Sequence, residues 1–377
     1  MSGICIIGGG ASGMAAAITA KKYAPDRAVI ILEKMKEPGR KLKATGNGRC
    51  NLSNSECDGY IKTLDFFDGI GVMTRTEESG RIYPYSEDAA DVVDALRGQL
   101  KDMGIRTICH AEVTAAEKTA DGFQVSWNGG RLLADRLLIA SGGKAGPKFG
   151  STGDGYRLAR GLGHTVTRLA PALTAVETRE NLRELSGVRE KCAVRLLRQE
   201  SVLCEERGEI QFTDYGVSGI CVFNLSRFME LPEGSSRKDG FDGYEIRIDL
   251  LPEIQDAEAL LIRRAGVGVP ADRLLCSLRK RPLAREISAR AGENLSELAH
   301  QLKEFTVHPA DLRGWQYAQV TRGGVPYSEI HPETMESKIC PGLFFAGEIL
   351  DYDGPCGGYN LQHAWETGIK AGKGLAG

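Results

Sequence analysis

Residues 3–13 read GICIIGGGASG, a short apolar run that ends in a glycine-rich turn. Such a run is typical of a strand buried on both faces, and the alanine-rich stretch that follows it, up to Tyr23, is typical of a helix. Gly8, Gly10 and Gly13 have the spacing that lets a backbone turn tightly and a pyrophosphate approach the helix N-terminus. This order of strand, turn and helix predicts a dinucleotide site.

Glu33 stands twenty residues after Gly13 and directly follows a second apolar run, residues 28–32. A carboxylate at the end of this strand accepts hydrogen bonds from the hydroxyls of an adenosine ribose and repels a 2′-phosphate. The alternative is a glycine-rich turn that binds no ligand, and the motif alone does not separate FAD from NAD. We assign these residues of the region to the cofactor: Gly8, Gly10, Ala11, Ser12, Gly13, Glu33 and Lys34.

Three further clusters favour FAD. Residues 39–51, GRKLKATGNGRCN, combine a flexible backbone with many donors, which suits a pyrophosphate and the carbonyl edge of a flavin; an exposed basic loop is the alternative. The SGG turn at 141–143 ends a predicted strand over 136–141, and a plain turn is its alternative. Residues 347–348 end another strand and residues 357–361 open a helix, which places a carboxylate near a polyol and helix N–H groups near a flavin ring.

From these clusters we predict a second set of cofactor contacts. They are Arg40, Lys41, Gly46, Asn47, Arg49, Cys50, Asn51, Ser141, Gly142, Gly143, Gly347, Glu348, Gly357, Gly358, Tyr359, Asn360 and Leu361.

The middle of the chain has a different pattern of apolar and polar residues. Between about residues 165 and 251, short alternating runs such as CAVRLL and YEIRIDL, with a turn predicted at 206–209, indicate an antiparallel sheet or barrel. Residues 256–305 carry apolar positions at helical spacing. After Gly314 buried strands return, as YAQVT and GLFFAG, before a last helix.

We therefore expect an α/β protein with a Rossmann-type FAD-binding domain over residues 1–168 and 313–377. A β-barrel-like domain over 169–252 and a helical domain over 253–312 interrupt it.

Composition limits the partners. Over 377 residues the net charge is −2, with 42% hydrophobic and 26% charged residues, so we expect a small-molecule substrate and neither nucleic acid nor membrane. No run of about 18 apolar residues predicts a membrane span. The uncharged start, residues 2–20, lacks a basic segment and is broken by glycines, so we expect no export. The ten cysteines form no CxxC pair, which favours a reducing cytoplasm and predicts no metal site.

Several longer motifs resemble a known family. They are GGGASGMAAAITA, GRKLKATGNGRCNLSN, GRIYP, FGSTGDGY, VTRGGV and FAGEILDYDGPCGGYNLQHAWETG, and together they span essentially the whole chain. They resemble the bacterial flavoproteins that include aminoacetone oxidases and bile-acid dehydro-steroid reductases. The resemblance implies a two-dinucleotide-type Rossmann FAD domain with an inserted β-barrel and helical bundle, and non-covalent FAD. By match, Glu33 takes the adenosine ribose, Val113 lies on the adenine side, and Glu348, Asn360 and Leu361 meet the ribitol and flavin.

The chain departs from the family pattern in the barrel motif. It has Thr213-Asp214 and Ser218-Gly219-Ile220 where the family usually has Thr-His and Ser-Gly-Pro, and His363 where an aromatic residue is common. These positions lie where the resemblance places the substrate, so the substrate is not carried over.

The sequence contains no second dinucleotide unit. The GVGVP segment at 266–270 lacks both the strand-to-helix context and the third glycine, and Cys50 and Cys57 do not have the spacing of a flavin-adjacent disulfide. We therefore expect NADH or NADPH, if used, to dock transiently over the flavin.

Acid–base candidates are few, and each has a structural alternative. His363 follows the flavin motif by one helical turn, Tyr352 and Tyr359 flank the GPCGG turn, Arg49 could polarise a carbonyl, and Cys356 could be a packed thiol. We assign no catalytic residue.

The expected function is that of an FAD-dependent oxidoreductase, an NAD(P)H-driven reductase of activated C=C bonds in an enone-type, steroid-like substrate. Alternatives are an oxygen-using amine or aminoketone oxidase on the same scaffold, a tRNA-modifying flavoprotein, and a flavin redox sensor without turnover. The sequence carries no indication of oligomeric state.

Overall fold

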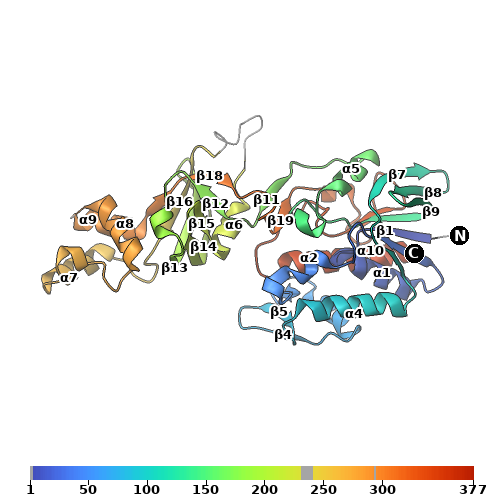
Figure 1. The fold of residues 1–377 in the computed structure, drawn as a ribbon, viewed down its shortest axis with the longest axis horizontal. Helices are drawn as coiled ribbons and strands as arrows, with labels where there is room; N and C mark the ends of the chain where they lie inside the picture. Colours follow the sequence, from blue (N-terminus) through green and yellow to red (C-terminus); the bar gives the residue numbers. More distant parts are fainter. Residues whose placement is uncertain (1–2, 231–240, 293) are drawn as a thin grey trace. The chain divides into compact units, whose positions relative to one another are not determined.

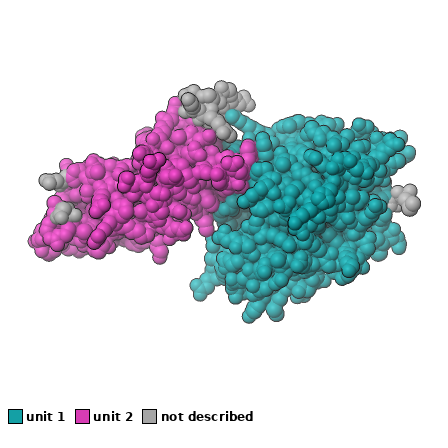
Figure 2. All heavy atoms as spheres, viewed as in Figure 1, with its two compact units in different colours: residues 1–171, 319–377 teal, residues 172–318 magenta. Residues whose placement is uncertain are grey.

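The computed structural model describes residues 3–230, 241–292 and 294–377. These residues form two compact units, coloured separately in Figure 2. Unit 1 comprises the chain up to Pro171 and from Gln319 onward, and unit 2 comprises Ala172–Ala318. The chain therefore leaves unit 1 once and returns once, and unit 1 is discontinuous in sequence.

The centre of unit 1 is a five-stranded parallel sheet (Figure 1). Its strands are almost entirely apolar because both faces are covered, as in α/β proteins generally. The strand order is β20 (Leu343–Phe345), β10 (Arg136–Ile139), β1 (Gly3–Ile7), β2 (Ala28–Leu32) and β6 (Arg106–Ile108), and each neighbouring pair is parallel. β10 stops two residues before the predicted end at Ser141.

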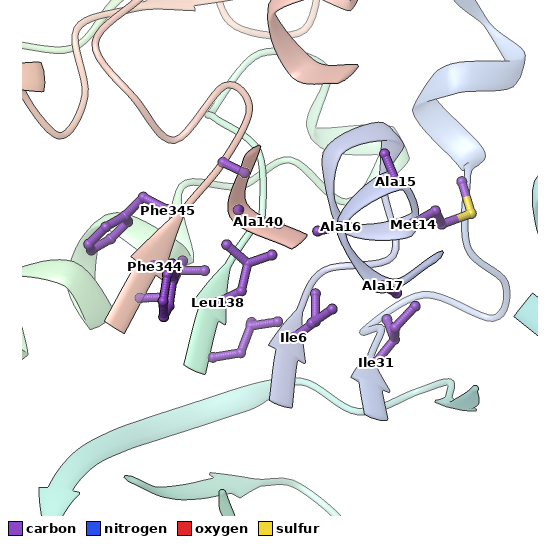
Figure 3. Close-up of a cluster of buried hydrophobic side chains, with 14 of the residues drawn as sticks. Ile6, Met14, Ala15, Ala16, Ala17, Ile31, Leu138, Ala140, Phe344 and Phe345 are labelled. Carbon is purple, nitrogen blue, oxygen red and sulfur yellow. The ribbon is translucent and has the colours of Figure 1, made fainter. Parts of the chain in front are cut away.

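Two helices pack against one another beside this sheet, α1 (Ala11–Tyr23) and α10 (Tyr359–Ala376). Small residues permit the close approach: a Cβ at Gly368 would lie 2.5 Å from the Ser12 carbonyl oxygen. Figure 3 shows α1 alanines beside the isoleucines and leucine of the strands. α1 begins at Ala11, earlier than the alanine-rich run suggested, so residues 11–13 form its first turn.

Smaller elements complete unit 1. They are the helices α2 (Arg40–Lys43), α3 (Tyr60–Asp68), α4 (Ala89–Asp102) and α5 (Asp154–Gly161), the antiparallel meander β7 (Val113–Thr119), β8 (Gly122–Trp127) and β9 (Gly130–Ala134), and a small sheet of β3 (Ser53–Asn54), β5 (Arg81–Pro84) and β4 (Thr74–Thr76). The small sheet is tied to α10, since Trp365 Nε1 donates to the Leu52 carbonyl at 3.0 Å and Ser53 Oγ donates to Gln362 Oε1 at 2.7 Å.

A two-stranded ribbon lies next to both boundaries between the units. Its strands are β11 (Ala170–Ala172) and β19 (Val320–Arg322). β11 contains the first boundary, and β19 begins two residues after Ala318.

Unit 2 contains a seven-stranded antiparallel sheet. The order is β17 (Phe305–Val307), β16 (Tyr244–Asp249), β13 (Arg189–Arg198), β14 (Ser201–Phe212), β15 (Gly216–Ser218), β12 (Val176–Thr178) and β18 (Pro309–Leu312). The two edge strands, β17 and β18, are consecutive and separated only by His308, so the sheet bends toward a barrel. The helices of unit 2, α6 (Ile220–Ser226), α7 (Ala257–Gly266), α8 (Arg281–Ala291) and α9 (Leu295–Lys303), share one hydrophobic core with the sheet.

Two local expectations for unit 2 differ from the structure. The turn predicted at 206–209 is wrong, because β14 runs straight through it; the reversal lies instead at Gln199 and Glu200, which have φ of 47° and 66°. Gly208 stands opposite Cys192 in the neighbouring strand, and a Cβ built on it would lie 3.5 Å from the Cys221 Cβ, an ordinary contact, so this glycine marks no turn. The end of the expected helical domain over 253–312 is not helical, because Phe305–Val307 and Pro309–Leu312 form β17 and β18.

Among residues 3–230, 241–292 and 294–377, none of the helices combines the length and the hydropathy of a membrane span.

Candidate functional site

The glycine-rich turns after β1, β10 and β20 touch one another at the carboxyl edge of the parallel sheet. A Cβ on Gly8 would lie 2.4 Å from the Ala140 carbonyl oxygen, immediately before Ser141. A Cβ on Gly347 would lie 2.4 Å from Ser12 Oγ at the start of α1. Parallel α/β sheets bind their ligands at this edge. The fold therefore brings three of the predicted clusters together.

The start of α1 is shaped to receive an anion. Gly10 is its N-cap, no side chain caps it, and a Cβ built on Gly10 has no atom within 4 Å. By contrast, a Cβ on Gly13 would lie 2.0 Å from the Gly8 carbonyl oxygen. The first N–H groups of a helix lack partners within the helix and attract negative charge. Gly13 thus allows the turn to form, and Gly10 leaves space above it.

Glu33 lies beside this turn with its carboxylate fixed in place. Its Oε2 accepts from the Gly9 N–H and its Oε1 from the Met35 N–H, both at 2.8 Å. Its own carbonyl accepts from Ala111 at 2.9 Å, which brings the chain leading to buried Val113 close to the carboxylate. Each carboxylate oxygen keeps capacity for a second donor.

Lys34 is engaged elsewhere. Its ammonium pairs with Asp154 at 3.0 Å and donates to Thr152 Oγ1 at 2.5 Å. Although burial opposes ionisation, the hydrogen bonds from Thr152 and Lys34 lower the pKa of Asp154. This ion pair joins the end of β2 to the start of α5.

Glu348 lies at the centre of a polar network. Its Oε2 pairs with Lys41 Nζ at 2.7 Å, and its Oε1 accepts from the Thr321 N–H at 2.8 Å. Thr321 Oγ1 accepts from the N–H groups of Lys144 and Ala145 at 2.7 and 3.0 Å. We call Lys41, Thr321, Glu348 and the turn at 143–145 the Glu348 network.

The loop around Asn51 packs against the start of α10. A Cβ on Gly358 would lie 3.0 Å from Asn51 Oδ1, and Asn54 Nδ2 donates to the Gly357 carbonyl at 2.9 Å. Asn360, predicted to face the ribitol or flavin, uses its side-chain amide to bind Gly354, accepting from its N–H at 2.8 Å and donating to its carbonyl at 2.9 Å. Its side chain therefore shapes the turn.

The remaining donors of the 39–51 loop are less uniform in placement. Arg49 stacks 4.3 Å from the centre of the Tyr83 ring and pairs with Glu77 at 3.4 Å, which favours the loop-holding interpretation. Asn47 is exposed, with a left-handed φ of 56°. Burial raises the pKa of the Cys50 thiol to about 12, so this cysteine is a neutral packed residue.

These residues fit FAD on observations independent of the sequence motifs. Within the described part of the chain, the buried atoms Asn51 Oδ1 and Ser141 Oγ have no hydrogen-bond partner, although such groups are nearly always satisfied. Asn51 Oδ1 lies by the start of α10, and Ser141 lies two residues after the end of β10, beside Gly8. The space above Gly10 adds an anion-accepting position.

A model of the HI0933-like protein Rossmann domain family matches residues 2–63 and 59–374. The chain belongs to this family. It is 37% identical to the 3-dehydro-bile acid delta(4,6)-reductase of Clostridium scindens, with 100% of this chain and 99% of that protein covered. It is 29% identical to the ribosomal RNA dihydrouridine synthase of Escherichia coli K12, covering 96% and 95%.

Among solved structures, the E. coli quinol fumarate reductase FrdA resembles the chain with a TM-score of 0.50 and 14% identity, over 100% of this chain and 70% of that one. At this identity the likeness concerns the fold alone. The expected family and the Rossmann-type FAD-binding fold are confirmed, and this HI0933-like protein is an FAD flavoprotein and an oxidoreductase.

A cluster of acid–base candidates lies beside the start of α10 in this HI0933-like flavoprotein. His363 Nε2 is 2.5 Å from the Tyr327 hydroxyl, and the His363 ring stacks on Tyr352 with centroids 4.0 Å apart and planes 11° from parallel. We call these three residues the Tyr–His–Tyr cluster. Burial, followed by the charge of Lys370, lowers the pKa of His363 to about 3, and burial raises the pKa of Tyr327. The Tyr352 hydroxyl is 2.8 Å from where Gly354 would carry a Cβ, so the cluster reaches the glycine turn.

Two residues of the candidate site, Thr321 and Tyr327, were not among the residues predicted from the sequence. Thr321 belongs to the VTRGGV motif, and the paired glycines of this motif were the one sequence feature that pointed to this segment. Its hydrogen-bond partners lie far away in the sequence. Tyr327 is in no motif that we singled out, and only the fold brings it to His363. Of the other candidates, burial raises the pKa of Tyr359, and Cys356 Sγ lies 3.8 Å from Gln319 Oε1.

Proposed function

We propose that this flavoprotein is an NAD(P)H-driven reductase of an activated C=C bond in an enone-type, steroid-like substrate. The observation that carries the proposal is the 37% identity, over the full length of both chains, to a protein named 3-dehydro-bile acid delta(4,6)-reductase. A name of this form denotes reduction of C=C bonds conjugated to a ketone. NADH or NADPH would be a transient co-substrate, since the sequence motifs include only one strand–turn–helix unit of the dinucleotide-binding type.

The chain's own residues would hold non-covalent FAD along the carboxyl edge of the sheet. Glu33 would accept from the adenosine ribose, the first turn of α1 would receive the pyrophosphate, and Glu348 would accept from the ribitol. The unpartnered oxygen of Asn51 would accept from the flavin ring near the start of α10. Bound FAD supplies hydride transfer to and from carbon.

The second hydrogen must arrive as a proton, and we propose that the Tyr–His–Tyr cluster supplies it. The raised pKa of Tyr327 keeps its hydroxyl protonated at neutral pH, as a proton donor requires. The low pKa of His363 keeps the ring neutral, and its hydrogen bond with the Tyr327 hydroxyl would hold that hydroxyl in place, while solvent would return the proton that Tyr327 gives to the substrate. Tyr352 holds the ring by stacking.

All ten cysteines are free thiols, and we propose a cytoplasmic location on this basis.

A second candidate is reduction of a uracil ring in RNA, favoured by the full-length match to the ribosomal RNA dihydrouridine synthase. Saturating uridine to dihydrouridine is also reduction of a C=C bond beside a carbonyl group, so the two candidates share their chemistry. A net charge of −2 favours the small molecule, because RNA-binding surfaces are usually basic. The tRNA-modifying flavoprotein stays an alternative of the same class.

The decisive experiment mixes the protein anaerobically with NADH or NADPH and follows the flavin absorbance. We expect bleaching by a nicotinamide, followed by return of the oxidised spectrum when a 3-keto-4-ene steroid is added. Return only with unmodified ribosomal RNA would favour the RNA candidate. Bleaching by amines alone would indicate the oxidase, and no bleaching by any donor would indicate the sensor.

A further inference from the structure

The Glu348 network joins four segments that are far apart in the sequence. Lys41 comes from α2, the 143–145 turn follows β10, Thr321 lies in β19, and Glu348 follows β20. Lys41 Nζ bonds both Glu348 Oε2 at 2.7 Å and the Ala145 carbonyl at 3.0 Å. The network therefore closes on itself: Lys41 and Thr321 each bind Glu348 and each bind the turn.

Packing leaves Thr321 little freedom. A Cβ on Gly143 would lie 2.4 Å from Thr321 Oγ1 and 2.8 Å from Glu348 Oε1, so only glycine fits beside both. Thr321 is fully buried, with both its N–H and its hydroxyl oxygen bonded. Its side-chain oxygen accepts two N–H groups, which a side chain without a hydroxyl would leave unpaired.

The chain that follows β19 runs alongside the residues that follow Glu348. Val325 N–H donates to the Ile349 carbonyl and Asp351 N–H donates to the Val325 carbonyl, both at 2.9 Å. A Cβ on Gly324 would lie 2.6 Å from the Ile349 carbonyl oxygen. The chain that has just re-entered unit 1 at Gln319 thus forms one wall of the Glu348 site.

We propose that Thr321 and Lys41 are positioning residues for FAD that act through Glu348. Thr321 fixes one carboxylate oxygen and the glycine turn next to it, while Lys41 fixes the other oxygen and neutralises its charge. The carboxylate then presents its remaining lone pairs in one direction, prepared for the cofactor hydroxyl before FAD arrives. The inference rests on Glu348 facing FAD and is independent of the reaction that the flavin performs.

The experiment measures the FAD dissociation constant of the apoprotein by flavin fluorescence for two matched pairs of variants. Thr321→Val removes the hydroxyl at constant shape, and Thr321→Ser restores it. Lys41→Met removes the ammonium beside Glu348, and Lys43→Met removes one from the same short helix. We expect the dissociation constant to rise about tenfold or more in Thr321→Val and Lys41→Met, the size of one lost hydrogen bond, and to change little in the other two variants.

Two further readouts separate positioning from mere stability. FAD should slow amide hydrogen exchange over residues 320–325 in the parent protein and less so in Thr321→Val. Melting of each apoprotein reports the structural contribution alone. A lowered melting temperature with an unchanged FAD dissociation constant in both Thr321→Val and Lys41→Met would overturn the proposal. If the parent binds FAD but oxidises no nicotinamide, the proposed function fails while these binding measurements still decide the inference.

Discussion

Glu33 is the residue for which sequence and geometry agree most closely. Both carboxylate oxygens already accept one backbone N–H, so the group is held in place before any ligand binds. We expect Glu33→Gln to weaken FAD binding by about 1–3 kcal/mol, because the neutral amide keeps only one acceptor oxygen and loses the charge-assisted hydrogen bond to the ribose. Glu33→Arg should weaken it further by removing both acceptors.

Titration of apoprotein with FAD checks this expectation, and Glu37→Gln is the matched control. Glu37 loses the same charge nearby in sequence but pairs with Arg97. Equal affinity of the parent and Glu33→Arg would remove Glu33 from the cofactor site.

The pKa of His363 leads to a prediction about how the free energy of unfolding depends on pH. Its pKa in the folded protein, about 3, lies below the value of about 6.5 expected for an unfolded chain. Between these values the unfolded chain binds the extra proton, so the free energy of unfolding should fall as the pH falls through this window. His363→Phe keeps an aromatic ring for Tyr352 and cannot titrate, so its stability should fall less steeply. Urea unfolding of the apoprotein from pH 7 downward measures both slopes, and equal slopes would contradict the assignment.

At the scale of elements, the turn between β1 and α1 contains two glycines with different expected roles, Gly13 in folding and Gly10 in FAD binding. Gly13→Ala places a methyl group 2.0 Å from the Gly8 carbonyl oxygen, so it should lower the melting temperature of the apoprotein. Gly10→Ala meets no atom within 4 Å, and its φ of −80° suits alanine, so the apoprotein should melt normally. FAD affinity should nevertheless fall in Gly10→Ala, because the methyl group occupies the path of the pyrophosphate. Full FAD affinity in Gly10→Ala would show that the ligand does not approach this turn.

The elements that sequence predicts well are those whose pattern is local. β1 and β2 have the predicted bounds because continuous apolar runs leave little choice for a buried strand. The turn at 206–209 misled because Glu206, Arg207 and Glu209 point to turns by composition, yet on a mostly exposed strand they are simply solvated. The small sheet of β3, β4 and β5 has strands too short to carry an alternating pattern.

The site residues also differ in whether a local pattern predicts them. Gly8, Gly10, Gly13 and Glu33 form one strand–turn–helix signature, so their proximity is encoded locally. Thr321 becomes a partner of Glu348 only through strand pairing that the sequence does not specify, and its hydroxyl bonds a turn 176 residues away. Lys34 and Asn360 match the motif, but their side chains bind Asp154 and Gly354 in the structure.

At the scale of the whole molecule, every residue predicted to bind the cofactor lies in unit 1, which the chain completes only after unit 2 has been inserted. Unit 2 has its own core and contributes none of these residues. A part of an oxidoreductase that does not hold the cofactor is available to select the substrate, and we propose this role for unit 2. The departures at Asp214 and Ile220 are then the first positions to test.

Both positions can be changed without disturbing unit 2. Asp214 is exposed in the connection between β14 and β15, and Ile220 is 47% exposed at the first position of α6, where proline is well accepted. We expect Asp214→His and Ile220→Pro to change the ratio of kcat/KM values across a panel of enone steroids by about tenfold, typical of one altered pocket contact. The FAD dissociation constant should stay that of the parent, because unit 1 is untouched. Val202→Ala, an exposed position at the other end of β14, is the control and should alter neither quantity. Unchanged selectivity in both folded variants would instead leave unit 2 with a role in stability or assembly, and substrate choice would then have to come from residues of unit 1 such as the Tyr–His–Tyr cluster.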